Sequence, residues 1–165
     1  MRDDAWFDGL FRAHATPVYR YLLRRGAGQD AHDLTADVLV TAWRRREDIP
    51  EGAELPWLYT TARYTLANHR RKGRPIPVAD VPEGVDDADP AALSIADEEV
   101  REVLAALSPR DRQVLLLHAW EGLDGDGLAD VLGISRGGAD AALSRARARL
   151  RQAWAERAEN VASQP

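Results

Sequence analysis

The chain has 165 residues, enough for one domain or two small ones, and its composition (45% hydrophobic, 30% charged) is ordinary for a folded protein. It contains no cysteine, which excludes disulfides, thiolate zinc sites and cysteine nucleophiles. The first residues lack the apolar core of a signal peptide, and no apolar run reaches membrane-spanning length. We therefore expect a cytoplasmic protein without membrane insertion.

Charge is distributed unevenly along the chain, although the net value is only −5. Residues 1–75 hold 13 basic and 10 acidic residues, residues 76–99 hold eight acidic residues and no basic one, and residues 100–165 hold nine of each. Residues 76–99 also carry prolines and no sustained apolar period. This composition predicts an extended acidic linker between two small domains, residues 1–75 and residues 100–160.

The first domain is predicted to be helical in four segments. Residues 4–14 form the first amphipathic segment, and residues 16–26 begin on a Thr-Pro pair that is typical of a helix start. Residues 30–48 align apolar side chains on one face, and residues 56–73 open on proline and close on basic residues before glycine. Because no period-two alternation occurs, the fold class is all-α.

The second domain continues the helical pattern and contains a helix-turn-helix. Residues 100–107 and 110–120 predict two helices, and a short helix follows around residues 128–132. Gly133 then predicts a tight turn, and Ser135 predicts the cap of a long final helix. Two helices joined by a glycine turn, the second one longer, are the signature of this DNA-binding motif.

Two basic clusters favour nucleic acid. The stronger one consists of His69, Arg70, Arg71, Lys72 and Arg74. It also complements a helix dipole, but three aromatic residues upstream on the same helix (Trp57, Tyr59 and Tyr64) favour contact with single-stranded or melting DNA. The weaker cluster, Arg145, Arg147 and Arg149, predicts phosphate positioning by the final helix.

Catalytic and metal-binding patterns are missing from the sequence. The four histidines fall on four different predicted helices, and no nucleophile elbow, P-loop or zincin motif occurs. Residues 124–130 superficially resemble a calcium loop, yet its fifth, sixth and twelfth positions are Leu128, Ala129 and Ser135. We expect no enzyme activity, no metal site and no cofactor.

Three stretches, taken in order, resemble the extracytoplasmic-function (ECF) sigma factors of bacterial RNA polymerase. Residues 30–49 resemble the region-two helix that docks on the polymerase clamp, and residues 56–75 the helix that reads and melts the minus-ten element. Residues 104–154 resemble the region-four domain that reads the minus-thirty-five element. The resemblance implies core RNA polymerase, promoter DNA and an anti-sigma protein as partners, and a loop at residues 49–55 that holds a flipped base.

The resemblance also implies a set of site residues. Polymerase binding falls on Asp33, Asp37, Trp43 and Arg44. DNA binding in the first domain falls on Arg63, Tyr64, Asn68, Arg70, Arg71, Lys72 and Arg74. In the second domain it falls on Ser135, Arg136, Asp140, Arg145, Arg147 and Arg149.

Two departures from the family pattern affect how the promoter is read. Family members often carry Asn where this chain has Tyr64, and they carry basic residues near Asp140 and Ala142. Residues 137–142 read Gly-Gly-Ala-Asp-Ala-Ala and offer bases only a carboxylate and the methyl groups of Ala139 and its neighbours. The sequence thus predicts weak upstream specificity. Two alternatives are a free-standing helix-turn-helix regulator and a sigma-like polymerase adapter.

Overall fold

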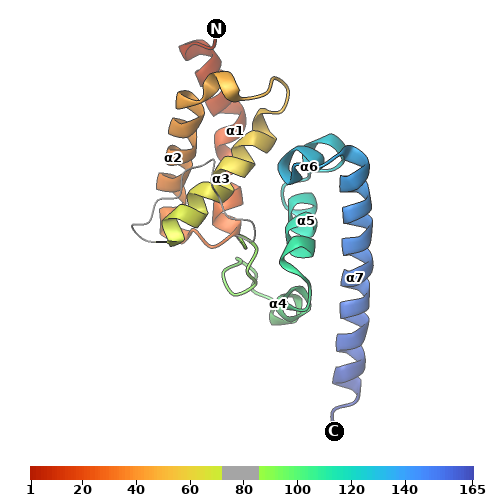
Figure 1. Ribbon diagram of the computed structural model, residues 1–165. Coiled ribbons are helices and arrows are strands. Elements are labelled where there is room, and N and C mark those ends of the chain that lie inside the picture. The colour runs from red at the N-terminus through yellow and green to blue at the C-terminus, as the bar shows by residue number, and fades with distance from the viewer. Residues whose placement is uncertain (72–85) are drawn as a thin grey trace. The chain divides into compact units, whose positions relative to one another are not determined.

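The computed structural model describes residues 1–71 and 86–165, and this part of the chain contains helices and connecting turns but no strand (Figure 1). The chain divides into two compact units, Met1–Asp87 (unit 1) and Ala88–Pro165 (unit 2). The all-α prediction is confirmed. None of the helices in the described residues combines the length and apolar character that a membrane span requires.

Unit 1 is built on three helices, α1 (Asp4–Arg24), α2 (Ala31–Arg44) and α3 (Glu54–Arg70), each of which packs against the other two (Figure 1). Single 3-10 turns, Gly28–Asp30 and Arg46–Asp48, follow α1 and α2. The buried core draws on all three helices and includes Leu10, Val18, Leu22, Leu34, Val38, Leu39, Leu58 and Leu66.

Helix α1 corrects one expectation, because the sequence predicts two helices that meet at Pro17 and the structure has one. Proline lacks the N–H that would bond the carbonyl four residues back, which costs about 3 kcal/mol in a helix interior. Leu10, Val18 and Leu22 nevertheless lie on a single buried face that spans the proline. Burial of this face against α2 and α3 outweighs the local preference for a break.

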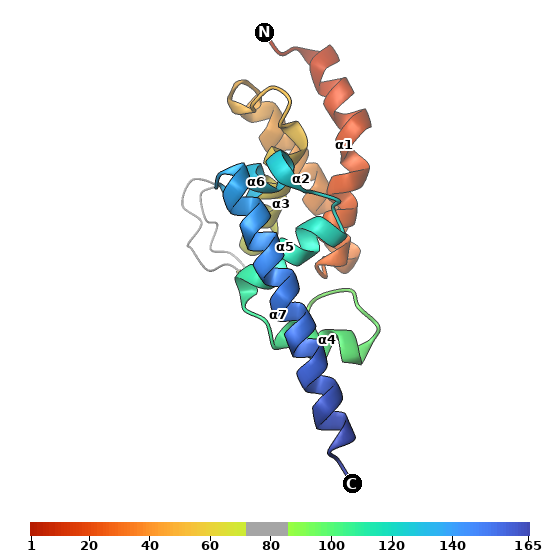
Figure 2. The same ribbon diagram turned by 90° about the vertical axis from the view of Figure 1, so that its right-hand side faces the viewer.

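Unit 2 consists of α4 (Glu98–Ala105), α5 (Pro109–Ala119), α6 (Gly125–Leu132) and the long α7 (Arg136–Ala162). Helix α7 packs against α4, α5 and α6, and Figure 2 shows it running past all three. The core between these helices includes Val103, Leu104, Leu107, Val114, Leu117, Leu128, Leu143 and Ala146.

The helix-turn-helix of unit 2 is formed by α6, its turn and α7, with the caps that the sequence predicts. Gly133 ends α6 in the left-handed region at a φ of 67°, which favours glycine. The Ser135 hydroxyl accepts a hydrogen bond from the Gly138 N–H at 3.0 Å and so caps α7. Helix α6 begins at Gly125, three residues earlier than expected.

The described part of the acidic segment, residues 86–99, contains buried positions, whereas the composition of residues 76–99 predicts an extended linker. Residues 76–85 lie outside the described residues, but Asp87, Ala88 and Leu93 are buried. The Arg112 Nε donates a hydrogen bond to the Ala88 carbonyl at 3.1 Å, which fixes that residue within unit 2. Residues 86–93 therefore belong to the folded units, with Asp87 in one and Ala88 in the other.

Candidate nucleic-acid and protein interfaces

One side of α3 carries a row of aromatic, amide and basic side chains, which we call the α3 row: Trp57, Tyr64, Asn68 and Arg71. The last three follow one another at spacings of four and three residues, so they share a helical face, and Trp57 lies two turns earlier on it. Tyr64 and Asn68 are half-buried, and Arg71 is exposed. Planar side chains beside a guanidinium suit the unstacked bases and phosphates of single-stranded nucleic acid.

Trp57 has a cationic neighbour that the sequence pattern did not indicate. The guanidinium carbon of Arg45 lies 5.7 Å from the centre of the Trp57 ring, within cation–π range. Arg46, the next residue, lies 4.0 Å over the ring of Trp43 instead. Arg45 and Arg46 are adjacent in the sequence, and nothing there distinguishes them. The turn after α2 directs their side chains to two different tryptophans.

The basic cluster at the end of α3 is divided between solvent and the protein. Arg70 and Arg71 are exposed, and Arg70 donates a hydrogen bond to the carbonyl of Arg25. His69 Nε2 lies 3.0 Å from the carboxylate of Asp30 and is paired within unit 1. The remaining predicted members of the cluster, Lys72 and Arg74, lie outside the described residues.

Two residues of α3 that the sequence associated with DNA point toward the protein. Tyr59 is 3% exposed and stacks on Tyr21 with ring centres 5.3 Å apart, so it belongs to the core. The Nε of Arg63 lies 3.5 Å from the carboxylate of Asp87, and its side chain is 24% exposed. Arg63 therefore lies at the edge between the core and the surface.

The loop that precedes α3 is short and tightly turned. Ile49 is buried, and the chain then turns through Gly52, whose φ is 83°. The Gly52 N–H donates a hydrogen bond to the side chain of Glu54 at 3.1 Å, and the Ala53 N–H donates one to the Pro50 carbonyl at 3.2 Å. The base-holding role of residues 49–55 stays a prediction that follows from the resemblance.

Helix α2 presents a charged face with an apolar residue in its middle, which we call the α2 face: Asp33, Asp37, Val40 and Arg44. The spacings of four, three and four residues place these side chains together, and all four are exposed. The predicted site residues do not include Val40, although it lies out of phase with the buried positions Leu34, Val38 and Leu39. An exposed valine ringed by ionised groups is typical of a protein contact.

Trp43 lies beside the α2 face rather than within it. Its ring meets the Phe7 ring edge to face at a centroid distance of 5.5 Å. Both aromatic residues line a pocket of about 500 Å³ together with Asp4, Asp8 and Val40. The groove between α1 and α2 thus combines aromatic surface with carboxylates, a combination suited to a partner helix that is basic and apolar.

In the helix-turn-helix, Arg136 folds back over α6. A Cβ on Gly125 would lie 3.2 Å from the Arg136 guanidinium, so glycine leaves room for this side chain. The Arg136 Nη1 lies 3.6 Å from the carboxylate of Asp126, and both side chains are largely exposed. Arg136 remains at the N-terminal end of α7, where backbone N–H groups favour an anion.

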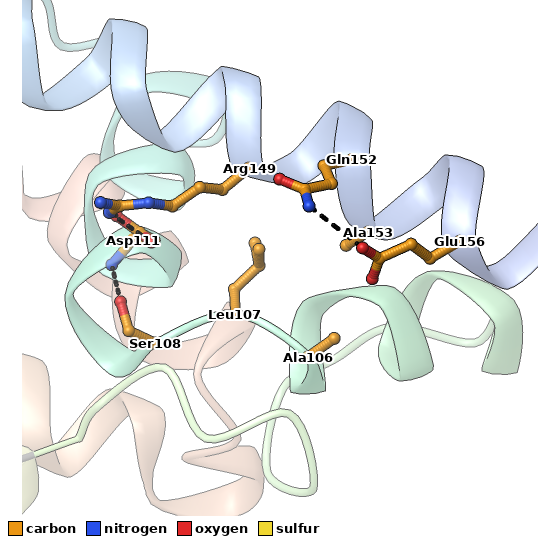
Figure 3. Close-up of a pocket in the computed structure, with 8 residues that line it drawn as sticks. All are labelled: Ala106, Leu107, Ser108, Asp111, Arg149, Gln152, Ala153 and Glu156. Carbon is orange, nitrogen blue, oxygen red and sulfur yellow. Dashed lines mark hydrogen bonds and ion pairs between the residues drawn. The ribbon is translucent and has the colours of Figure 1, made fainter.

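Two of the three predicted phosphate-contacting arginines of α7 have partners inside unit 2. Arg149 Nη1 donates to both carboxylate oxygens of Asp111 at 3.0 Å, and Figure 3 shows the side chain directed at Asp111 across a pocket. Arg147 Nη2 lies 2.8 Å from Nε2 of His118. Arg145 is exposed and has no ion pair among the described residues. DNA contact by all three stays a prediction, and Arg145 is the most available.

The N-terminal turns of α7 carry few side chains that can hydrogen-bond to a base. Gly137, Asp140 and Ala141 are exposed, whereas Ala139 is fully buried and faces the core. The expectation of a methyl contact from Ala139 is therefore wrong, because the helix turns that position away from solvent. Asp140 is the one ionised side chain between Gly137 and Ala142.

Comparisons with known proteins agree with this order of elements. A family model described as Sigma-70 region 2 matches residues 10–75, and one described as Sigma-70, region 4 matches residues 97–150. The chain is 34% identical to the RNA polymerase sigma-E factor of Streptomyces coelicolor, over 74% of this chain and 71% of that protein. It is 32% identical to the ECF RNA polymerase sigma factor SigG of Mycobacterium tuberculosis, over 86% of this chain and 48% of SigG. The chain thus spans about half the length of SigG.

Two solved structures have a similar fold. CnrH in complex with the cytosolic domain of CnrY aligns with a TM-score of 0.61 at 22% identity, covering 91% of this chain and 88% of that one. The sigma factor RpoE in complex with the anti-sigma factor NepR from Bartonella quintana aligns with a TM-score of 0.57 at 23% identity, covering 89% and 95%. At these identities the likeness concerns the fold alone.

Proposed function

The chain belongs to the sigma-70 family as an extracytoplasmic-function type sigma factor, and on that premise we propose that it binds core RNA polymerase and directs promoter recognition, melting and transcription initiation. One observation carries the proposal: unit 1 combines the exposed α2 face with the α3 row, and unit 2 contains a helix-turn-helix. The chain itself catalyses no step in this proposal, and it acts in the cytoplasm with polymerase.

Polymerase docking is assigned to the α2 face and the adjoining Trp43. Val40 gives the contact an apolar centre, and the surrounding Asp33, Asp37 and Arg44 give it a charged rim. Because these four side chains are exposed, changing them leaves the core of unit 1 intact.

The test is the double charge reversal Asp37→Arg with Arg44→Glu, which leaves the net charge unchanged. It is expected to abolish co-purification with core polymerase and run-off transcription, while circular dichroism stays helical. The matched control is Arg151→Glu with Glu159→Arg on exposed positions of α7, which we expect to behave like the wild type. Normal polymerase binding by the α2 variant would exclude this docking face.

Promoter opening is assigned to the α3 row and to Arg70. Melted DNA exposes base faces and single-strand phosphates, and the row offers Trp57 and Tyr64 for the former and Arg71 for the latter. Potassium permanganate footprinting of the polymerase complex measures the opening directly. A Trp57→Ala, Tyr64→Ala variant should bind polymerase yet leave promoter thymines unreactive.

The upstream contact is proposed to be weakly sequence-specific. A bidentate arginine–guanine pair gives about 1–3 kcal/mol of discrimination, and residues 137–142 include no arginine to make one. Single-base changes across the upstream element are therefore expected to reduce transcription by less than about tenfold each, equivalent to about 1.4 kcal/mol. Larger losses of transcription from such changes would show that the upstream contact is strongly sequence-specific.

A free-standing helix-turn-helix regulator is the nearest rival function, and a sigma-like polymerase adapter with weak upstream DNA readout is the second. The regulator gives no role to the α2 face or to the α3 row. The adapter gives no role to the α3 row. Binding assays with duplex promoter DNA distinguish the three: the regulator binds without polymerase, the sigma factor opens DNA with polymerase, and the adapter does neither.

Regulation by an anti-sigma protein completes the proposal. The similar RpoE structure contains the anti-sigma factor NepR, and this chain carries exposed apolar side chains, Phe11 and Val40, on α1 and α2. A protein that covers these residues would compete with polymerase for the α2 face. Copurification from the native host, followed by release of transcription when the captured protein is removed, tests this step.

A further inference from the structure

A buried group of charged and aromatic side chains joins Asp87, in the middle of the acidic segment, to the helices of unit 1. Arg25, just after α1, is 1% exposed, and Asp87 is 3% exposed. Arg63 reaches the same carboxylate from α3, and Tyr21 reaches it from α1. We call Tyr21, Arg25 and Arg63 the arginine cradle.

The cradle holds the Asp87 carboxylate from three sides. Arg25 Nε lies 3.4 Å from one carboxylate oxygen and Arg63 Nε lies 3.5 Å from the other. The Tyr21 hydroxyl donates a hydrogen bond to the first oxygen. The Arg25 guanidinium also lies 3.7 Å over the Tyr21 ring, and Tyr21 in turn stacks on Tyr59.

Such a cradle requires an anion. A guanidinium taken out of water loses its hydration, and an uncompensated buried charge is strongly destabilising. Asp87 compensates the charge here, but guanidinium groups bind phosphate oxygens with the same geometry as carboxylate oxygens. A phosphate is therefore a chemically equivalent occupant whenever the Asp86–Asp87 segment moves away.

The cradle is continuous with the surface assigned to DNA. A pocket of about 180 Å³ is lined by Ala67, Arg70, Arg71, Asp86 and Asp87, so the acidic pair lies against the exposed arginines that end α3. Arg63 is next to Tyr64 in the chain and is still 24% exposed at its side chain. Strand phosphates that follow the α3 row would reach Arg63 at the position where Asp87 now lies.

We propose that the arginine cradle is a phosphate site for single-stranded promoter DNA, which Asp87 occupies in the free protein and thereby limits DNA binding before promoter opening. The inference rests on the proposed function, because it assigns the DNA to the α3 row. It adds an internal competitor: one carboxylate of this chain must leave before the cradle contributes to DNA binding.

The first test is Asp87→Asn in the full chain, which keeps the side-chain shape and removes the competing charge. Its affinity for a fluorescein-labelled single-stranded oligonucleotide, followed by anisotropy, is expected to rise about tenfold over the wild type. The salt dependence should steepen by about 0.7 in log–log slope, as for one added phosphate contact. Glu98→Gln is the control, since it removes the same charge at an exposed position and should change the affinity less than about twofold.

Adding Arg63→Gln to the Asp87→Asn chain identifies the site. The double variant should lose the gain in affinity and in salt slope. Unchanged binding by a folded Asp87→Asn protein, or an equal gain in the Glu98→Gln control, would overturn the proposal.

A second test keeps the cluster intact and covers the case in which Asp87→Asn unfolds unit 1. Because the chain has no cysteine, Ala67→Cys with Asp86→Cys introduces a single thiol pair across the pocket. A short bis-methanethiosulfonate cross-linker, which forms a disulfide with each cysteine thiol and releases a sulfinate, should close it, lower the affinity for the oligonucleotide about tenfold, and release the block on reduction. Failure of the pair to cross-link, or unaltered binding by the cross-linked chain, contradicts the closed state.

The two levels of inference fail separately. Run-off transcription by the wild type with core polymerase tests the proposed function alone. If transcription occurs and Asp87→Asn shows no gain, the cradle is only a structural ion-pair group. If transcription fails while Asp87→Asn gains affinity, the phosphate site stands and the sigma-factor function does not.

Discussion

Helices α3 and α7 are the two elements to which the sequence assigns DNA contact, and the arginines that end α3 differ in their partners from those of α7. At the end of α3, Arg70 and Arg71 are exposed beside a face with two aromatic rings. In α7, Arg147 and Arg149 contact His118 and Asp111 of α5, and Arg157 bridges Glu99 and Glu102 of α4 at 2.9 and 2.8 Å. Several arginines of α7 therefore bind other helices of unit 2.

The number of arginines on a helix therefore does not measure its capacity to read DNA. A guanidinium paired with a carboxylate must lose that partner before it neutralises a phosphate, and the exchange cancels most of the gain. On this argument we expect promoter selection to rest mainly on unit 1, and we expect unit 2 mainly to supply position. Three experiments test this contrast, and a fourth tests the acid stability of unit 1.

The largest effect is expected from removing the exposed arginines of α3. Arg70→Ala with Arg71→Ala should weaken single-stranded DNA binding by tenfold or more, about 1.4 kcal/mol. It should also flatten the salt slope by about 1.4, as for two lost single-strand contacts. The control, Arg12→Ala with Arg20→Ala, removes the same charge from exposed positions of α1. Equal salt slopes for the two variants would mean that the α3 arginines serve only as a helix cap.

A smaller, opposite effect is expected from adding charge to α7. Asp140 is exposed near the start of the helix, where it repels phosphates. Asp140→Lys should tighten binding to duplex DNA by about 1 kcal/mol and steepen the salt slope by about 0.9 for one new contact. The gain should be similar for many upstream sequences, and electrophoretic mobility shifts on several duplexes measure it. A gain confined to one sequence would show that α7 already reads bases.

Arg149→Ala should affect stability more than DNA binding. It removes a two-pronged contact to Asp111, whose side chain is 9% exposed, but Arg149 itself is 55% exposed and solvent screens the pair. We expect a loss of about 1 kcal/mol in the unfolding free energy of unit 2, measured by urea denaturation. The salt slope of DNA binding should stay at the wild-type value. A flatter slope would show that Arg149 contacts a DNA phosphate.

The smallest effect concerns acid and should be confined to unit 1. Burial lowers the pKa of His14 below its ordinary value of 6.5, and attraction to Glu54 partly opposes the shift. The unfolded chain therefore binds a proton at a pH where the folded chain does not. Stability falls as the pH drops from 6.5 toward the folded pKa and changes no further below it. His14→Gln should reduce the difference in melting temperature of unit 1 between about pH 5 and about pH 7.5; an unchanged difference would assign the acid sensitivity to other groups.

Features set by neighbouring residues could be predicted from the sequence. Ser135 caps α7 as expected, and Ser108 caps α5 in the same way. Each hydroxyl accepts a hydrogen bond from the N–H group three residues ahead, at 3.0 Å for Ser135 and 3.1 Å for Ser108. Gly133 takes the left-handed conformation that its place between two helical patterns requires. Helical periodicity likewise predicts that Asp33, Asp37 and Arg44 lie on the exposed side of α2.

Features set by distant residues could not be predicted. The partner of Arg149 lies 38 residues earlier in the chain, and that of Arg63 lies in an acidic stretch whose carboxylates look alike in sequence. Pro17 has the local signature of a helix start, yet packing on both sides of it maintains one helix. Ala139 and Ala141 differ in exposure only because α7 has a fixed rotation against α5 and α6.

The first turns of α7 carry an evolutionary consequence. A Cβ on Gly137 would meet nothing within 4 Å, and Asp140 and Ala141 are exposed, so the fold places no demand on these side chains. Gly138 differs, because a Cβ there would lie 3.1 Å from the Ser135 hydroxyl that caps the helix. Single substitutions at Gly137, Asp140 or Ala141 can therefore change which upstream promoter element is preferred without disturbing the fold. A duplicated copy could diverge toward a separate set of genes without first acquiring stabilising mutations.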